Sequence, residues 1–549
     1  MRVLFTWFVL LFSIVLLLSS CSPKTDDNTS ESTDNSSSSS SEDISISSSP
    51  SGSSSNNANV TFGQTFQHQV TTTGTYSGSI TYTLSNHPEG MTISSSGLIE
   101  WTPTEEDQIK TYSNITITIT TASGYIFTQT FDLTVTASSA SIISAGFNHS
   151  CAVLDNGSVK CWGYNQYGEL GIDNTTFMGD NSGEMAQLTG INLGTGRTAT
   201  STSVGTIHTC ALLDNTSVKC WGENTRGQLG IDNNNSMGDD SGEMAQLTGI
   251  NLGTGRTAKS ISMGEYHSCA LLDNASVKCW GWNHYGQLGI GSNVTMGDGS
   301  GEMDSLPTIN LGTGRTATAI SAGYYHSCAV LDNASVKCWG RNNYGQLGIG
   351  SASMKGRYSR EMGDNLTAAD LGTGRTATAI AAGTFHSCAV LDNGVVKCWG
   401  YNYYGQLGIG NATSMGDGSG EMGDNLAVVD LGTGRTATAI SAGDFHTCAL
   451  LDNGAVKCWG YNINGQLGIG NTTTMGDGSG EMAQLTGINL GTDRTATAIS
   501  AGMYHTCAKL DNGAVKCWGR NNLGQLGIDN TTYMGDDSGE MASLPSVNL

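Results

Sequence analysis

The strongest constraint on the fold is an internal repeat. From about Ser138 to the last residue the sequence repeats with a period of 59 or 60 residues, and a cysteine in the same context marks each of seven copies. A typical copy reads A-T-A-I-S-A-G-x-x-H-S-C-A-V-L-D-N-G-S-V-K-C-W-G-x-N-x-x-G-Q-L-G-I-G, then an acidic M-G-D-G-S-G-E-M segment, then L-x-x-I-N-L-G-T-G-R. Each copy predicts four short strands. Such a unit buries only one face of a small sheet, so it needs a neighbour on each side, and a closed ring gives one to every copy.

Three motifs of the copy, A-G-x-x-H, G-x-V-x-x-W-G and N-x-x-G-Q-L-G, resemble the repeat of the regulator of chromosome condensation family. The resemblance covers all seven copies and implies a seven-bladed β-propeller over residues 138–549. The composition agrees, because 75 Gly, 6 Pro and 13% charged residues favour strands joined by glycine turns over helices. We therefore predict an all-β protein, with a small β-sandwich before the propeller.

Hairpin register predicts disulfides within each copy. If the loop Asp-Asn-Gly places Gly157 in the left-handed region, Cys151 faces Cys161 across the two strands, within disulfide range. The 15 cysteines are an odd number, and without Cys21 the other fourteen fall into such pairs. Zinc held by each pair with a nearby histidine is the competing interpretation, disfavoured by three ligands per site in an oxidising compartment. The predicted pairs are Cys151–Cys161, Cys210–Cys220, Cys269–Cys279, Cys328–Cys338, Cys388–Cys398, Cys448–Cys458 and Cys507–Cys517.

The remaining residues that recur in every copy are interpreted as structural. His149 and its equivalents are expected to donate hydrogen bonds to the neighbouring loop, and Trp162 and its equivalents to pack between blades. Three copies carry Thr216, Ala275 or Ala334 where the others have Gly in the hairpin loop. Each of these replacements costs about 1 kcal/mol if the turn is unchanged.

The N-terminal residues 1–21 predict an export signal. An apolar run from Val3 to Leu18 ends in Ser19-Ser20-Cys21 and resembles the lipobox of bacterial lipoproteins. The resemblance implies cleavage before Cys21, acylation of that residue, and anchoring at a bacterial outer membrane or cell surface. A plain signal peptide or a short membrane helix is the alternative. Residues 22–58, rich in Ser, are predicted to be a disordered tether.

Residues 59–137 predict a β-sandwich of about seven strands. The segments 115–119 and 131–135 alternate apolar and polar residues, which is the period of a half-buried strand. The stretch from Tyr82 to Pro103 resembles the immunoglobulin-like, cadherin-related modules of bacterial surface proteins. This segment has no Cys and no Asp-x-Asp pair like those of cadherin calcium sites, which disfavours an inter-sheet disulfide and calcium binding. It is interpreted as a spacer, and contact with a ligand is the alternative.

One face of the ring is predicted to bind a partner. This loop face carries the two variable positions of A-G-x-x-H and the long segment after W-G, and the copies differ there mostly in aromatic residues, a composition typical of binding surfaces. Acidic pairs such as Asp298 and Glu302, or Asp477 and Glu481, are placed on the same side, and the fourth copy differs by Lys355, Arg357 and Arg360. Drift on unselected loops is the alternative, and calcium in the M-G-D-G-S-G-E-M segments is a further one. The predicted face residues are Tyr164, Tyr167, Trp282, His284, Tyr285, Tyr324, Tyr325, Tyr401, Tyr403, Tyr404 and Phe445.

Together these features predict a surface-anchored, non-catalytic and monomeric scaffold that binds a protein or glycan without a metal or other cofactor. The chain has no P-loop, no G-x-S-x-G and no H-E-x-x-H, which disfavours an enzyme. A formal net charge of -23 disfavours nucleic acid as a partner. An inhibitor of a secreted hydrolase is the alternative, because an exported bacterial β-lactamase inhibitor resembles the same propeller family. Guanine-nucleotide exchange, implied by the namesake, is opposed by export, the lipid anchor and the acidic surface.

Overall fold

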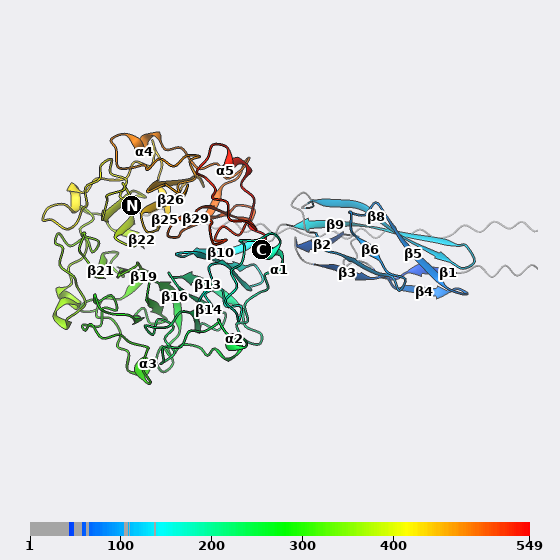
Figure 1. Ribbon diagram of the computed structural model, residues 1–549, viewed down its shortest axis with the longest axis horizontal. Helices are drawn as coiled ribbons and strands as arrows, with labels where there is room; N and C mark the ends of the chain where they lie inside the picture. The colour runs from blue at the N-terminus through cyan, green and yellow to red at the C-terminus, as the bar shows by residue number, and fades with distance from the viewer. Residues whose placement is uncertain (1–42, 49–56, 62–64, 104–107, 109, 137–138) are drawn as a thin grey trace, which may run out of the picture.

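The chain forms two β-rich units, a small sandwich and a ring of blades beside it (Figure 1). A computed structural model describes residues 43–48, 57–61, 65–103, 108, 110–136 and 139–549. The predicted fold class, a seven-bladed β-propeller preceded by a β-sandwich, is confirmed. The predicted signal peptide with Cys21, and residues 22–42 and 49–56 of the predicted tether, lie outside the described residues.

The sandwich consists of nine described strands around one apolar core. Its sheets have the orders β2-β9-β8-β5, β3-β7-β6 and β1-β4, and β2 pairs with β9 in parallel. The core is built from alternating inward residues such as Ile115, Ile117 and Ile119 on β8. The strands are β1 (Asp43–Ile46), β2 (Asn57–Thr61), β3 (Phe66–Gln69), β4 (Thr72–Thr75), β5 (Ile80–Ser85), β6 (Thr92–Ile93), β7 (Leu98–Trp101), β8 (Thr111–Thr121) and β9 (Ile126–Thr136).

The sandwich begins earlier and has more strands than the sequence predicted. Strand β1 lies in the predicted tether, where it pairs with β4, and β2 also starts before residue 59. The cause is a pair of apolar residues in a serine-rich stretch, because Ile44 is only 4% exposed in the core and Ile46 packs against it. Two isoleucines among so many polar residues are too weak a signal to outweigh the composition.

Each blade is a three-stranded antiparallel sheet built from one copy of the repeat. The first strands are β10 (Ala140–Ala145), β13 (Ala199–Val204), β16 (Ala258–Met263), β19 (Ala317–Ala322), β22 (Ala377–Ala382), β25 (Ala437–Ala442) and β28 (Ala496–Ala501). The second strands are β11 (His149–Leu154), β14 (His208–Leu213), β17 (His267–Leu272), β20 (His326–Leu331), β23 (His386–Leu391), β26 (His446–Leu451) and β29 (His505–Leu510). The third strands are β12 (Val159–Gly163), β15 (Val218–Gly222), β18 (Val277–Gly281), β21 (Val336–Gly340), β24 (Val396–Gly400), β27 (Val456–Gly460) and β30 (Val515–Gly519).

The fourth strand that each copy predicted is reduced to isolated main-chain contacts with the third strand. In blade 1, the glycine that ends β12 pairs with Met178, and the same antiparallel bridge recurs in all seven blades. In blade 4 the partner is Lys355 instead of Met. The segment after W-G is rich in turns, many of them at glycines with positive φ, so the backbone does not stay extended long enough to form a ladder.

In the described part of the propeller, helix occurs as single turns on the outer part of the blades. Five of these turns begin at the glutamate of the acidic segment, and blades 4 and 5 have 3-10 turns instead. Within the described part of the chain, no helix has the length and apolar character needed to cross a bilayer. The turns are α1 (Glu184–Gln187), α2 (Glu243–Gln246), α3 (Glu302–Ser305), α4 (Glu481–Gln484), α5 (Glu540–Ser543), η2 (Ser359–Glu361), η3 (Gly363–Asn365) and η4 (Gly423–Asn425).

The ring closes by direct contact of blade 7 with blade 1. Strand β10 contacts β28 and β29, and the amide of Ala140 donates to the carbonyl of Gly513 at 2.9 Å. Blade 2 makes the same bond to blade 1, from Ala199 to Gly157 at 2.7 Å. Each blade consists of consecutive strands, so closure uses no exchanged strand. Seven apolar cores lie between neighbouring blades, one for each seam of the ring.

Candidate binding face

The hairpin between the second and third strands has the register that the sequence predicted. The amide of Leu154 donates to the carbonyl of Ser158, and Gly157 has a φ of 76°. Cys151 lies opposite Cys161, and all seven predicted pairs form disulfides with Cα separations of 4.0 or 4.1 Å. The three residues that replace Gly in this loop keep the left-handed turn, with φ of 66° at Thr216, 63° at Ala275 and 59° at Ala334.

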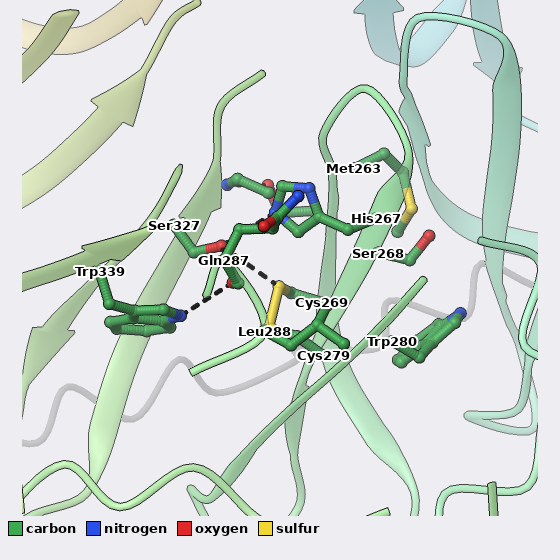
Figure 2. Close-up of a disulfide and its surroundings, with 12 residues drawn as sticks. Met263, His267, Ser268, Cys269, Cys279, Trp280, Gln287, Leu288, Ser327 and Trp339 are labelled. Carbon is green, nitrogen blue, oxygen red and sulfur yellow. Dashed lines mark hydrogen bonds between the residues drawn. A yellow bond between two sulfur atoms is a disulfide. The ribbon is translucent and has the colours of Figure 1, made fainter. Parts of the chain in front are cut away.

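A polar relay next to each disulfide joins one blade to the next. Figure 2 shows the seam between blades 3 and 4, where the hydroxyl of Ser327 and the indole nitrogen of Trp339 both donate to the main-chain carbonyl of Gln287. The hydroxyl therefore accepts its other hydrogen bond from Nε2 of His267, at 2.9 Å. Equivalent bonds connect all seven histidines to a Ser or Thr of the following blade, and His505 closes the circle on Ser150.

Burial keeps these seven histidines neutral. Each is fully buried, and burial lowers the pKa of each imidazole to about 3. Nε2 carries the proton, and Nδ1 has no hydrogen-bond partner among the described residues. The histidines are structural, as the sequence suggested, but the acceptor is a strand hydroxyl of the next blade instead of a loop. The tryptophans lie in the inter-blade cores.

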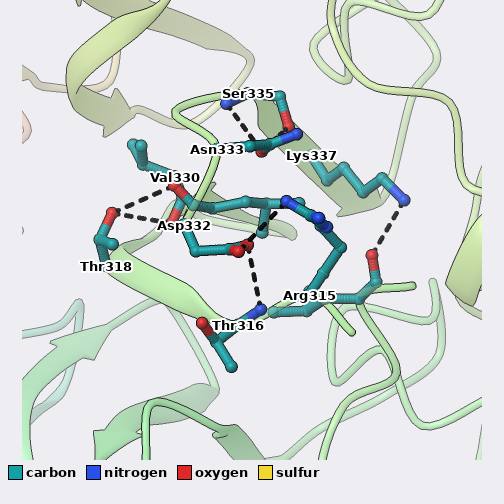
Figure 3. Close-up of polar contacts among 10 residues, drawn as sticks. Arg315, Thr316, Thr318, Val330, Asp332, Asn333, Ser335 and Lys337 are labelled. Atoms are coloured by element: carbon teal, nitrogen blue, oxygen red, sulfur yellow. Dashed lines mark hydrogen bonds and ion pairs between the residues drawn. The ribbon is translucent and has the colours of Figure 1, made fainter. Parts of the chain in front are cut away.

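The opposite face of the ring is held by an ion pair repeated in six blades. In blade 4, Arg315 contacts Asp332 at 3.1 Å, beside the bond from the amide of Thr316 to the same carboxylate (Figure 3). In blade 1 the arginine is absent, and the hydroxyl of Ser139 contacts Asp155. Both partners of each ion pair are more than a third exposed, so each is worth well under 1 kcal/mol and acts mainly to fix the turn.

The repeated acidic segments stabilise their own loops. In blade 3, Glu302 Oε2 accepts the amides of Gly297 and Gly299, both at 2.8 Å. Glu481 in blade 6 does the same, so one oxygen of each of these carboxylates is bound by the main chain of its own loop. Within the described residues, no three His, Cys, Asp or Glu side chains gather as metal ligands, including around Asp298 and Asp477.

The loop face carries a continuous aromatic arc over blades 3 to 7. Its rings contact one another with centroids 4.5 to 6.5 Å apart, and Arg341 joins the two halves because its guanidinium lies 5.4 Å from Tyr325 and 5.1 Å from Phe385. Nine of the predicted face residues belong to it. The aromatic arc consists of Tyr266, Trp282, His284, Tyr285, Tyr324, Tyr325, Tyr344, Phe385, Tyr401, Tyr403, Tyr404, Phe445, Tyr461 and Tyr504, with Arg341.

The other two predicted face residues lie outside this arc. Tyr164 and Tyr167 contact each other, and Tyr164 also contacts Phe177, all within blade 1. In blade 4, Arg357 and Arg360 lie over the exposed ring of Tyr358.

Sequence reasoning missed the arc members Tyr266, Tyr344, Phe385, Tyr461 and Tyr504. They occupy the same variable positions of A-G-x-x-H, W-G-x and N-x-x-G as the residues that were found, so a register-by-register comparison of the copies would have identified them. The continuity of the arc was not predictable, because it depends on the angle between neighbouring blades.

Comparison with known proteins relates both units to described families. The family model "RCC1-like domain" matches residues 128–415, the model "Regulator of chromosome condensation (RCC1) repeat" matches 437–466 and 496–525, and "Putative Ig domain" matches 43–136. The ultraviolet-B receptor UVR8 of Arabidopsis thaliana is 29% identical over 392 residues, covering 70% of this chain and 78% of the receptor.

Solved structures show the same fold at lower identity. Human WBSCR16 superposes with a TM-score of 0.53 at 20% identity, covering 71% of this chain and 93% of that one. Yeast RCC1 (Prp20), solved with Kap60 bound to it, gives a TM-score of 0.51 at 19% identity, covering 66% and 77%.

Proposed function

This chain belongs to the RCC1-like domain family, and we propose that it is a non-catalytic scaffold whose loop face binds a protein or glycan partner at a cell surface. The observation that carries the proposal is the aromatic arc. Tyr and Trp are the residues that contribute most to binding surfaces, because their rings are large, rigid and amphipathic. Several rings are open to solvent, and Tyr403 is 64% exposed.

A protein is the favoured partner class. The yeast relative was solved in a complex with another protein, and the Arabidopsis relative is a receptor. The repeat copies also diverge in this chain where the arc lies, whereas the seams between blades stay alike. The residues that replace one another there are mostly aromatic, and this composition favours selection for contact over drift on loops.

The test uses the full chain carrying Cys21→Ser, immobilised and offered host matrix proteins, bacterial envelope proteins, a glycan panel and secreted hydrolases. We expect the triple variant Tyr401→Ser, Tyr403→Ser and Tyr404→Ser to weaken a captured interaction at least tenfold. The matched control replaces Tyr76 and Tyr125, which are exposed on the sandwich, and should bind as before. If the arc variant retains every interaction, the proposed face is wrong. Loss of a hydrolase's activity on binding would assign the inhibitor function instead.

We further propose that Cys21 carries the lipid that holds this scaffold at the membrane, with the serine-rich segment as spacer. Two or more acyl chains bind a membrane durably, whereas one holds it weakly. Metabolic labelling with an alkyne fatty acid should mark the chain in bacteria, and Cys21→Ser should abolish the label. Protease shaving of intact cells then distinguishes a surface-exposed protein from a periplasmic one. Labelling that survives Cys21→Ser would contradict the anchor.

A further inference from the structure

The central channel ends on the loop face in a cavity that all seven blades line. Each blade contributes the end of its first strand, Ala-Gly or its equivalent, and the next residue, and the cavity has a volume of about 80 Å³. The backbone there is fixed, because a Cβ on Gly323 would come within 2.3 Å of the carbonyl oxygen of Gly383 in the next blade. The residue after this glycine is therefore where the blades are free to differ in side chain.

Two of the seven residues at that position are acids. Glu265 comes from blade 3 and Asp444 from blade 6, so they stand nearly opposite each other across the channel. The described residues that line the cavity include no Lys, Arg or His. Two carboxylates thus share one small space without a basic neighbour in its wall.

Glu265 is buried and incompletely paired. It is only 5% exposed, and its Oε2 has no hydrogen-bond partner among the described residues. Burial raises the pKa of Glu265 to about 7, although the hydroxyls of Tyr324 and Tyr325 oppose that shift. Burial also raises the pKa of Asp444 to about 6, opposed by the hydroxyl of Thr384. A buried carboxylate oxygen without a hydrogen-bond partner is costly, so the orphaned Oε2 favours a ligand that completes it.

The rim of the cavity is suited to a positive charge. Tyr266 and Phe445 of the aromatic arc directly follow the two acids in sequence, and Tyr324, which is followed by Tyr325, lines the cavity itself. The arc already holds one guanidinium by stacking, since Arg341 lies 5.1 to 5.4 Å from three rings. Aromatic faces attract cations, and more strongly where water is displaced.

We propose that the channel mouth binds one alkylammonium or guanidinium group, which enters between Glu265 and Asp444 and is enclosed by the rings of the aromatic arc. This inference rests on the proposed binding function and names the chemistry that the partner must present. A calcium ion would need six to eight oxygen ligands, and within the described residues no three acidic or other metal-ligating side chains gather there. A single organic cation needs only the charge and the rings.

The group could belong to a free amine or to a Lys or Arg side chain of a protein, and both carry the same chemistry. The test titrates the full chain, carrying Cys21→Ser, with n-butylammonium, N-acetyl-arginine amide and the peptide Gly-Gly-Lys-Gly-Gly. The uncharged N-acetyl-norleucine amide is the control ligand. We expect calorimetric binding of the charged probes and none of the neutral one, and the tighter of amine or peptide indicates the source.

The double variant Glu265→Gln and Asp444→Asn should weaken binding of the charged probes at least tenfold. Glu223→Gln, an acid of the loop face outside the cavity, should leave it unchanged. Affinity should also rise about tenfold from pH 6 to pH 8, as Glu265 ionises among Tyr266, Tyr324, Tyr325 and Asp444.

Equal binding to the double variant, equal binding of the neutral probe, or binding of Ca²⁺ but not of amines would overturn this assignment. Failure here remains distinguishable from failure of the binding function. If the double variant captures a partner as the parent does, while the triple tyrosine variant does not, the face binds without a cation in its channel. If neither variant loses a partner, the face itself is wrong.

Discussion

The seams between blades and the loop face differ in burial, in hydrogen bonding and in how alike the seven copies are. At the seams, seven near-identical sets of Cys, Trp, His and Ser or Thr are fully buried and hydrogen-bonded from one blade to the next. On the loop face, residues at equivalent positions differ from blade to blade, rings are exposed and the carboxylate of Glu265 is incompletely paired. The difference shows where stability resides and where the chain is free to build a site.

The largest expected effect is a loss of folding stability at low pH, because the buried histidines of the seams take up protons when the protein unfolds. The seven histidines have a pKa of about 3 when folded, against 6.5 when exposed, so their contribution is complete above pH 6.5 and is lost as the pH falls towards 3. Each costs about 1.4 kcal/mol per pH unit in that window, so the ring loses on the order of 10 kcal/mol between pH 7 and pH 5. Thermal unfolding followed across this range should show a steep fall in the midpoint.

Two variants show whether the seams cause this fall. His267→Gln keeps a donor for Ser327 and removes one buried imidazole, so the number of protons taken up on unfolding should drop by one. His284→Gln removes a histidine of the aromatic arc and should leave the proton uptake of the seams intact. A midpoint that does not change between pH 7 and pH 5 would contradict the neutral, buried state of the ring.

Glu169 introduces a titratable acid into the seam between blades 1 and 2. Blades 2 to 7 carry Gln at this position, and blade 1 carries a glutamate that is 0% exposed. Burial raises the pKa of Glu169 to about 8, with Glu223 and Asp239 adding to the shift. Because the folded pKa is raised, this acid stabilises least at high pH, and stability falls as the pH rises from about 4.5 to about 8.

Glu169→Gln should therefore stabilise the protein by roughly 3 kcal/mol at pH 8 and by much less at pH 5. Denaturant unfolding at the two pH values measures the difference. The reverse change in blade 2, Gln228→Glu, is the matched control and should destabilise the protein, more at pH 8 than at pH 5. A gain from Glu169→Gln that is equal at both pH values would mean that the acid is not protonated in the fold.

The seams were predictable from the sequence, and the site was predictable only in part. The register that pairs Cys151 with Cys161 follows from a three-residue loop, because a hairpin leaves no freedom once its turn is set. The aromatic positions of the face followed from divergence between copies. What could not be inferred is which rings meet, or that Glu265 and Asp444 share one cavity, since both depend on the curvature of the ring.

The acidic segments show that residue type alone does not identify a ligand site. The sequence suggests Asp298 and Glu302 as ligands. The main-chain amides of Gly297 and Gly299, however, already donate hydrogen bonds to Oε2 of Glu302. The fourth strand was lost for a related reason, because glycine turns replace a ladder beyond the bridge from Gly163 to Met178. In both cases the main chain satisfied its hydrogen bonds locally.

Removing one cystine tests whether the seams are equivalent. Cys328→Ala with Cys338→Ala opens a short loop with a sequence separation of 10, and the chain-entropy account gives a loss of about 2 to 3 kcal/mol. The same pair of changes at Cys388 and Cys398 in blade 5 should cost the same within about 0.5 kcal/mol. Unfolding midpoints of the two variants make the comparison. A large difference between them would show that the seams are not interchangeable.

The smallest expected effect comes from the hairpin loops, where three blades depart from the others. Ala275 adopts a φ of 63°, a conformation that costs an alanine about 1 kcal/mol relative to glycine. The loop is also crowded, because a Cβ on Gly454 at the equivalent position of blade 6 would lie 2.6 Å from the Cβ of Thr495. Ala275→Gly should therefore raise the free energy of unfolding by about 1 kcal/mol, and Gly454→Ala should lower it by at least as much. If Ala275→Gly lowers the free energy of unfolding instead, the extra conformational entropy that glycine loses on folding outweighs the relief of backbone strain. This loop would then be less constrained than its counterpart in blade 6.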